Sequence, residues 1–354
     1  MLIEAEGSWS GPLFAEGDLK RLHRLYGSLP DWAQPSVAVA ATSAAKAEHR
    51  SWLEEQVTRL SPVERADFLP RLKSAEQYAQ SVAELALGDV LATSASRVRH
   101  SPTIGHLTPD LVATVEGGHE VAFEVWTRCI PPEVSTQRRH WGLLASRIAT
   151  IGVPVLLAVD AAPRPATEPP ASAELGPMLA SLRRWLSSGE YRVQRTLELN
   201  GFRFIAMRDA DGAQAQMVPV IPSTHADSRH VWDSINAKVS RYRRLVNTEG
   251  LPFVVALSAE PGTGLDRGLV EGALKGNNTM SLTFSVGTFG PIAPRQVEMR
   301  RTNAPPVFDP CLSAVAWIEF PGARGSHLSV WPIAGASRPI PTMEGPEITH
   351  SALD

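Results

Sequence analysis

Two acidic residues, Asp110 and Glu124, lie 14 positions apart in apolar runs that are typical of β-strands. Asp110 follows Thr108-Pro109 at the start of the first run, and Glu124 lies within the second. An acid that opens one strand of a hairpin can lie beside an acid within the partner strand. Paired carboxylates suit a hard divalent cation, Mg²⁺ or Mn²⁺, which can activate water and stabilise charge on a phosphoryl group. The other interpretation is an aspartate in a turn and a glutamate in an exposed ion pair.

The elements that must position these acids follow from hydrophobic periodicity and turn residues. The runs 111–115 and 121–128, joined by a Gly-Gly turn, predict a β-hairpin. Helices are expected before it, at about 74–91, and after it, at about 134–151. The continuous apolar run 153–159 has the composition of a strand that is buried on both faces.

From Glu84 to Val159 this order of elements resembles the PD-(D/E)XK nuclease superfamily. In that family a helix with an acid is followed by Pro-Asp on one strand, Glu-x-Lys on the next, a helix and a strand. The resemblance implies that Asp110 and Glu124 hold the metal, joined by the backbone carbonyl of Val125, and that Glu84 is the assisting acid. It also implies a restriction-endonuclease-like mixed sheet flanked by helices, and metal-dependent hydrolysis of phosphodiesters in DNA or RNA.

The lysine of that family pattern, which positions or activates the attacking water, is replaced by Trp126, whose indole carries no charge. Arg128 lies on the same strand face by the period of two, but a guanidinium is too basic to accept a proton. Lys238 falls within the apolar arc of a helix expected at 229–246, so its amine must reach solvent or pair with a carboxylate. The alternative is that this helix packs near the site and supplies the missing cation. The candidate catalytic residues are Glu84, Asp110, Glu124, Arg128 and Lys238.

The basic residues are five lysines and 29 arginines, and several of the arginines cluster. Clustered arginines suit phosphate contacts, so nucleic acid is the expected partner, DNA rather than RNA. The alternative is that arginine replaces lysine on solvated helix faces. The candidate nucleic-acid-binding residues are Arg138, Arg139, Arg241, Arg243 and Arg244.

Composition excludes several other classes of protein. The net charge of −3 gives no overall basic field, and two cysteines, Cys129 and Cys311, exclude a disulfide scaffold. The N-terminal residues lack the apolar segment of a secretory signal, and no apolar run approaches the ~18 residues of a membrane span. We therefore expect a cytoplasmic protein without a membrane partner, compatible with a homo-oligomer or a protein partner.

The length of 354 residues allows two or three domains. We expect an α/β protein with a helical N-terminal region at 1–73, a nuclease-like α/β core at 74–260 and a C-terminal extension of unknown role at 261–354. Further strands are expected in the second half, at 252–257, 280–286, 314–320 and 328–333. Two functions follow: a Mg²⁺-dependent nuclease, or, because of Trp126, an inactive nuclease-like module for nucleic-acid binding or assembly.

Overall fold

A computed structural model gives the fold of this chain. It describes residues 12–160, 164–189, 195–209, 212–222, 226–276, 279–283, 296–300, 307–319, 325–351 and 353. The chain forms an α/β structure around a seven-stranded mixed sheet that is flanked by helices, which confirms the expected class. None of the described helices combines the length and the apolar character needed to cross a membrane.

The central sheet has the strand order β1-β2-β3-β8-β11-β12-β13. Its strands are β1 (Arg97–His100), β2 (Leu111–Thr114), β3 (Glu120–Arg128), β8 (Phe253–Ala259), β11 (Ala314–Glu319), β12 (His327–Pro332) and β13 (Ile348–His350). The hairpin of β2 and β3 is antiparallel, whereas β3, β8 and β11 run parallel to one another. Every residue of β8 is buried, as its central place between two parallel neighbours requires.

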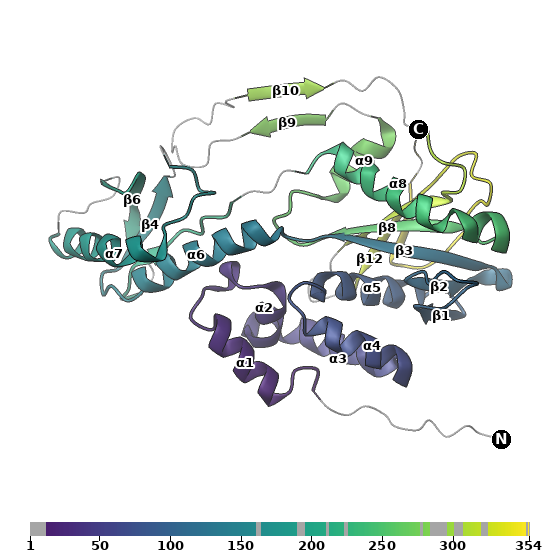
Figure 1. Cartoon of the computed structure of the whole chain (residues 1–354), viewed down its shortest axis with the longest axis horizontal. Coiled ribbons are helices and arrows are strands. Elements are labelled where there is room, and N and C mark those ends of the chain that lie inside the picture. The colour runs from purple at the N-terminus through teal and green to yellow at the C-terminus, as the bar shows by residue number, and fades with distance from the viewer. Residues whose placement is uncertain are drawn as a thin grey trace.

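Helices cover both faces of this sheet (Figure 1). On one face lies α5 (Tyr78–Leu91), whose Ala83 and Leu87 pack against Phe123 and Val125. The other face is covered by α8 (Ser228–Arg244), followed by a π-helical turn, η4 (Leu245–Glu249), and by α9 (Arg267–Lys275). The side chain of Asp227 caps α8 by accepting from the backbone N–H of His230, and the apolar arc of α8 packs against β8.

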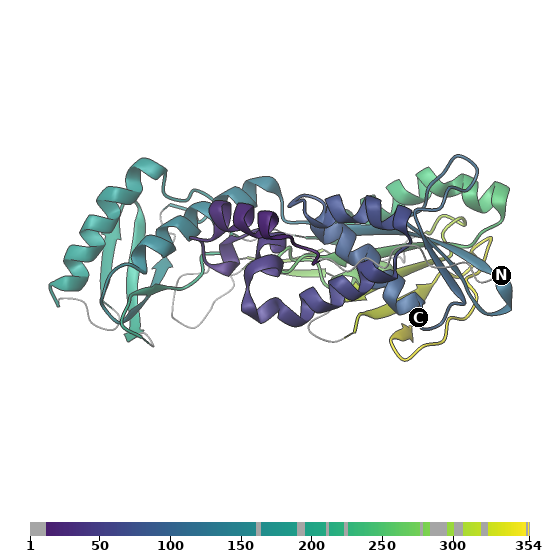
Figure 2. The same cartoon turned by 90° about the horizontal axis from the view of Figure 1, so that it is seen from below.

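The N-terminal region is helical, as predicted, and packs against α5 (Figure 2). Its helix α4 begins with the predicted capping box, in which Ser61 and Glu64 satisfy each other's backbone N–H groups. Leu53, Phe68 and Leu85 share one buried cluster, so this region shares a core with α5. Its elements are α1 (Glu16–Tyr26), η1 (Asp31–Ala33), α2 (Ser36–Thr42), η2 (Ala44–Lys46), α3 (Ala47–Arg59) and α4 (Pro62–Leu72).

A second, four-stranded sheet lies at the end of the molecule away from β1 and β2 (Figure 1). The expectation that the apolar run 153–159 joins the core sheet is wrong, because this run forms β4, which pairs with β6 and β7. The parallel neighbour of β3 is instead β8, which begins about a hundred residues after the start of the run 153–159. The inserted unit contains α6 (Pro132–Ile148), β4 (Val155–Asp160), α7 (Ser172–Ser187), β5 (Thr196–Leu199), β6 (Phe202–Asp209) and β7 (Gln216–Met217).

The predicted domain boundary at residue 260 cuts through the central sheet. β11 pairs with β8 over Ala314–Trp317, and β12 and β13 continue the sheet beyond it. The residues after 260 therefore complete the core, and the strands expected at 314–320 and 328–333 are β11 and β12. The strand expected at 280–286 corresponds to β9 (Thr279–Thr283), which pairs with β10 (Gln296–Arg300), while residues 284–286 lie outside the described part.

Candidate active site

Asp110 and Glu124 lie opposite each other where β2 begins and β3 continues past it. The ladder pairs Leu111 with Phe123, so one further step along it brings Asp110 opposite Glu124. Asp110 Oδ2 accepts a hydrogen bond of 2.8 Å from the backbone N–H of Val125. The Asp110 side chain thus accepts the hydrogen bond that the next backbone carbonyl of a longer β2 would accept. The two acids lie side by side at the point where the strands separate.

Lys238 brings a positive charge to this pair from the helix that covers the same face of the sheet. Its Nζ lies 2.7 Å from Glu124 Oε1, and the Glu124 side chain is only 3% exposed. The apolar arc of α8 that contains Lys238 packs on the core beneath it, which explains why the amine turns to a carboxylate. Trp126, which stands in the lysine position of the family pattern, is partly buried against that same core.

Glu84 reaches the site from α5, on the opposite face of the sheet. Its Oε1 pairs with the Arg71 guanidinium and accepts from Gln80 Nε2 at 3.1 Å. Gln80 also donates to the Val125 carbonyl at 3.1 Å and accepts from the Thr127 N–H at 3.0 Å. One glutamine therefore ties the helical acid to the edge of β3 that β2 leaves open.

The acids are crowded enough to perturb their ionisation. Burial, followed by the charges of Glu84 and Glu124, raises the pKa of Asp110 to about 7. Burial also raises the pKa of Glu84, and Arg71 only partly opposes it. Three carboxyl groups thus lie near two cations, Arg71 and Lys238, and Arg71 is also paired with Asp67.

Two carboxylate oxygens in this cluster, Glu84 Oε2 and Glu124 Oε2, are buried without a hydrogen-bond partner among the described residues. Buried oxygens with excess negative charge are the chemistry that a hard cation satisfies. Within the described part of the chain, however, no three His, Cys, Asp or Glu side chains form a group able to hold a metal. The Val125 carbonyl, expected as a further ligand, accepts from Gln80. The described residues therefore bring two carboxylates together, Asp110 and Glu124, with Glu84 near them, and they form no larger group of metal ligands.

The remaining predicted residues lie elsewhere. Arg128 Nε donates to the Thr263 carbonyl at 3.2 Å, in the loop after β8. Of the two cations that were expected to replace the family lysine, Lys238 is the one that contacts Glu124. Arg138 is 8% exposed and donates to the Gly262 carbonyl, so most of its side chain is buried beside the loop after β8. Arg139 is exposed on α6.

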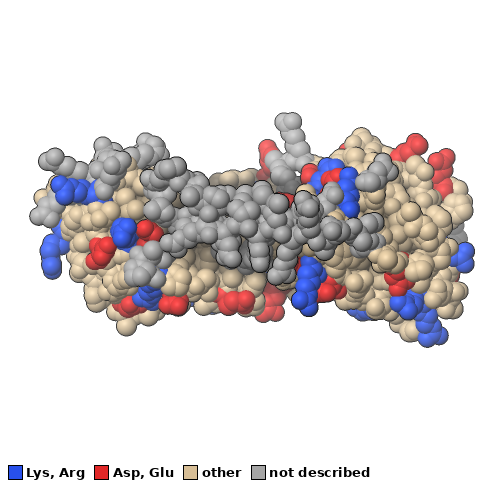
Figure 3. Space-filling model, turned by 90° about the horizontal axis from the view of Figure 1, so that it is seen from above, with Lys and Arg blue, Asp and Glu red and all other residues tan. Residues whose placement is uncertain are grey.

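The arginines at the end of α8 are exposed but engaged. Arg243 pairs with Asp309 at 2.5 Å, and Arg244 lies 3.3 Å from His106 Nε2. The guanidinium of Arg241 lies over the ring of Tyr242. On the face seen in Figure 3, the described basic and acidic side chains are interspersed. This arrangement resembles a solvated helix face more than a continuous phosphate-binding surface.

Three contributors were not predicted from the sequence: Gln80, Arg71 and Tyr242. The Tyr242 hydroxyl donates to the Thr108 carbonyl at 2.9 Å, and burial together with the Glu124 charge raises the pKa of Tyr242. Gln80 lies one helical turn before Glu84, so the i, i+4 spacing is a signal that could have found it.

No protein-family model, curated protein or solved structure matches the chain.

Proposed function

We propose that this protein is a metal-dependent nuclease of the PD-(D/E)XK type, with a restriction-endonuclease-like core. The observation that carries the proposal is the ion pair between Lys238 and Glu124, at 2.7 Å, beside Asp110. An ammonium group beside two metal-binding acids is the combination that the family pattern provides with Glu-x-Lys. Here the lysine comes from α8 and the place after Val125 holds a tryptophan.

The order of core elements supports the same proposal. Helix α5 is followed by β1, β2 and β3, and after the inserted unit by α8 and β8, with β8 parallel to β3. With the insertion set aside, this is the order of helix, strands, helix and strand on which the resemblance rests. β8 takes the place that the sequence assigned to the run 153–159.

In this proposal Asp110 and Glu124 hold Mg²⁺ or Mn²⁺, which when bound would polarise the scissile phosphoryl group. Lys238 orients the attacking water and stabilises negative charge that develops on the phosphate. Glu84 assists by positioning Gln80, which holds the edge of β3, and is itself paired with Arg71. Hydrolysis adds water to phosphorus and breaks one P–O ester bond, and the leaving alcohol takes up a proton.

The test is cleavage of single- and double-stranded DNA and of RNA with Mg²⁺ or Mn²⁺, comparing wild type with Asp110→Asn. Loss of a metal-dependent activity in Asp110→Asn supports the proposal, and activity that survives the substitution places the chemistry elsewhere. Lys238→Arg is the companion variant, because it keeps the charge but changes the shape of the donor. A folded wild type that cleaves no substrate would favour the second candidate.

That second candidate is an inactive nuclease-like module that binds nucleic acid or supports assembly. The observation that favours it is Trp126, whose uncharged indole stands in the position of the family lysine. The Lys238 ammonium, which neutralises Glu124, would also compete with a metal. A metal titration separates the two. Binding of Mn²⁺ that Asp110→Asn abolishes favours the nuclease, and the absence of binding favours the module.

A further inference from the structure

A cavity of about 360 Å³ opens where the N-terminal helices meet the end of the central sheet. Cys129 and Ile130, directly after β3, and Glu260, directly after β8, form its floor. These are the carboxyl ends of two adjacent parallel strands, the place where open α/β sheets bind their ligands. The volume falls in the range of small-molecule sites, roughly 300–1,000 Å³.

One wall of the cavity carries a buried cation that lacks a full set of partners. Arg138 is 8% exposed; its Nη2 donates to the Gly262 carbonyl at 3.2 Å, while its buried Nε has no partner among the described residues. Burial lowers the pKa of Arg138, although Glu260 opposes this shift. The Glu260 oxygens themselves accept from Ser36 Oγ at 2.6 Å and from the Ile130 N–H at 2.8 Å. An anion in the cavity would balance the half-buried charge of Arg138, which Glu260 offsets only in part.

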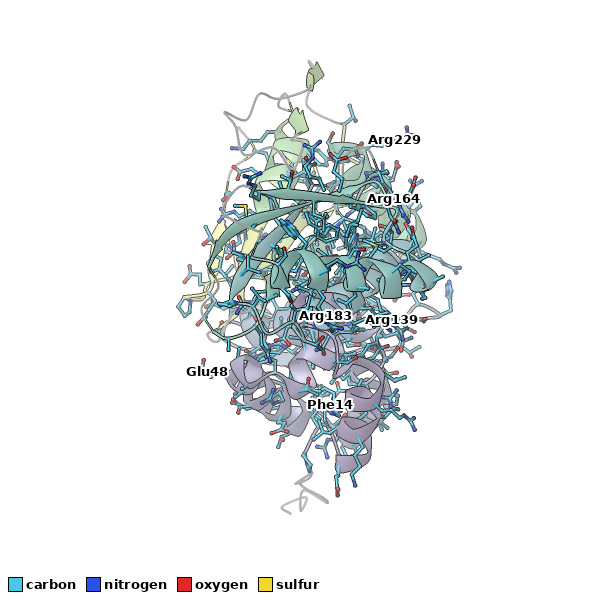
Figure 4. The ribbon with its side chains drawn as sticks, turned by 90° about the vertical axis from the view of Figure 1, so that its left-hand side faces the viewer. Phe14, Glu48, Arg139, Arg164, Arg183 and Arg229 are labelled. Carbon is cyan, nitrogen blue, oxygen red and sulfur yellow. The ribbon has the colours of Figure 1, made fainter. Side chains whose placement is uncertain are left out.

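The other walls define the shape and chemistry of the ligand. Arg139, the next residue of α6, is exposed, lines the same cavity, and lies where α6 faces the N-terminal helices (Figure 4). Tyr26 and Pro35 contribute an aromatic ring and an apolar surface, and Glu76 adds an acid to the lining. Two guanidinium groups beside apolar and aromatic surface fit a phosphate joined to a planar base.

The cavity lies along the same strand as the candidate active site. Cys129 lies five positions after Glu124, and at ~3.3 Å per residue this is about 16 Å. That is the length of about five stacked nucleotides of one strand. A strand whose end occupies the cavity can therefore present an internal phosphodiester to Asp110 and Glu124.

We propose that this cavity binds a nucleoside monophosphate unit, the phosphorylated end of the nucleic-acid strand that the active site cleaves, with the phosphate on Arg138 and Arg139. The strand-end part of this proposal rests on the proposed nuclease function. A free nucleotide presents the same chemistry, and the experiment distinguishes the two sources.

The experiment is a calorimetric titration of the full chain with dAMP, and with oligonucleotides that carry or lack a terminal phosphate. It uses Asp110→Asn as the background, to prevent cleavage. Arg139→Gln is the test variant, since Arg139 is exposed and the substitution leaves the core intact. Arg147→Gln, an exposed arginine two turns further along α6 and outside the cavity lining, is the matched control.

We expect dAMP to bind, Arg139→Gln to weaken it about tenfold, and Arg147→Gln to leave it unchanged. A terminal phosphate should strengthen oligonucleotide binding by a similar factor. Equal effects of the two arginine variants, or no binding of dAMP, would overturn the proposal. Binding of dAMP without a preference for phosphorylated ends would reject the strand end in favour of a free nucleotide. Binding of dAMP by a chain that cleaves nothing would keep the cavity assignment and reject the nuclease.

Discussion

Replacing Asp110 by asparagine should stabilise the protein at high pH and not at low pH. Glu84, Glu124 and Lys238 are the charged groups that face Asp110, and the folded protein raises its pKa from the ordinary 3.8 to about 7. The folded state therefore retains this proton between pH 3.8 and 7, where the unfolded state has released it. In that window the stability contributed by Asp110 falls as the pH rises.

The magnitude follows from the shift. Between pH 5 and about pH 7 the folded state holds a proton that the unfolded state has released. Over these two pH units, each unit lowers the free energy of unfolding of the wild type by about 1.4 kcal/mol. The free energy of unfolding of Asp110→Asn should therefore rise relative to wild type by about 2.5 kcal/mol over this range. Burial lowers the pKa of His49 and His100 to about 4, but these histidines titrate in both proteins and cancel in the difference.

The assay is urea unfolding followed by tryptophan fluorescence at pH 5 and pH 8, in buffer that contains a chelator. Asp233→Asn is the control, because Asp233 is an exposed aspartate of α8 and its replacement should change stability by less than about 0.5 kcal/mol at either pH. If Asp110→Asn differs from wild type by the same amount at both pH values, burial and the neighbouring carboxylates do not raise the pKa of Asp110 as the structure implies.

Three further predictions concern the site and its supports. Lys238→Met should lower the free energy of unfolding, measured in urea, by about 3–5 kcal/mol, because it leaves Glu124 buried without a counter-charge. The double variant Glu124→Gln/Lys238→Met should recover most of that loss. A double variant that is no more stable than Lys238→Met would contradict this prediction. Mn²⁺ affinity, followed by calorimetry, should rise between pH 6 and pH 8 as Asp110 releases its proton, whereas any residual binding by Asp110→Asn should stay flat. Gly142→Ala should destabilise the protein by about 1–3 kcal/mol in a thermal melt, because a Cβ on Gly142 of α6 would overlap with that of Ala33; the stabilisation usual for this change within a helix would show that the two elements do not pack as described.

The local elements around the site could be predicted because their signals are short in range. The β2–β3 hairpin and the helices α5 and α8 follow from alternation, glycines and helical periodicity. The partner of β3 could not be predicted in the same way. The runs that became β4 and β8 are both continuous and apolar, and only the tertiary packing of the inserted unit separates them.

The site shows the same limit at the level of single residues. That Lys238 needs solvent or a carboxylate follows from its place on an apolar helix face, but nothing in the sequence names Glu124 as its partner, 114 residues away. Gln80 was missed because a glutamine in a helix is ordinary surface composition, and its role depends on the open edge of β3. The burial of Arg138 beside the loop after β8 could not be predicted, because that loop is more than 100 residues away in the sequence.

The insertion between β3 and α8 also has a consequence for biosynthesis. The acids Asp110 and Glu124 are synthesised well before Lys238, which lies 114 positions after Glu124. At roughly 5–20 residues per second, this leaves the acids without their ammonium partner for about 6–23 s. The inserted unit has its own sheet and core and can fold during that interval. The nascent chain can therefore form its peripheral unit before the site, which is assembled only when α8 and β8 pack against β3.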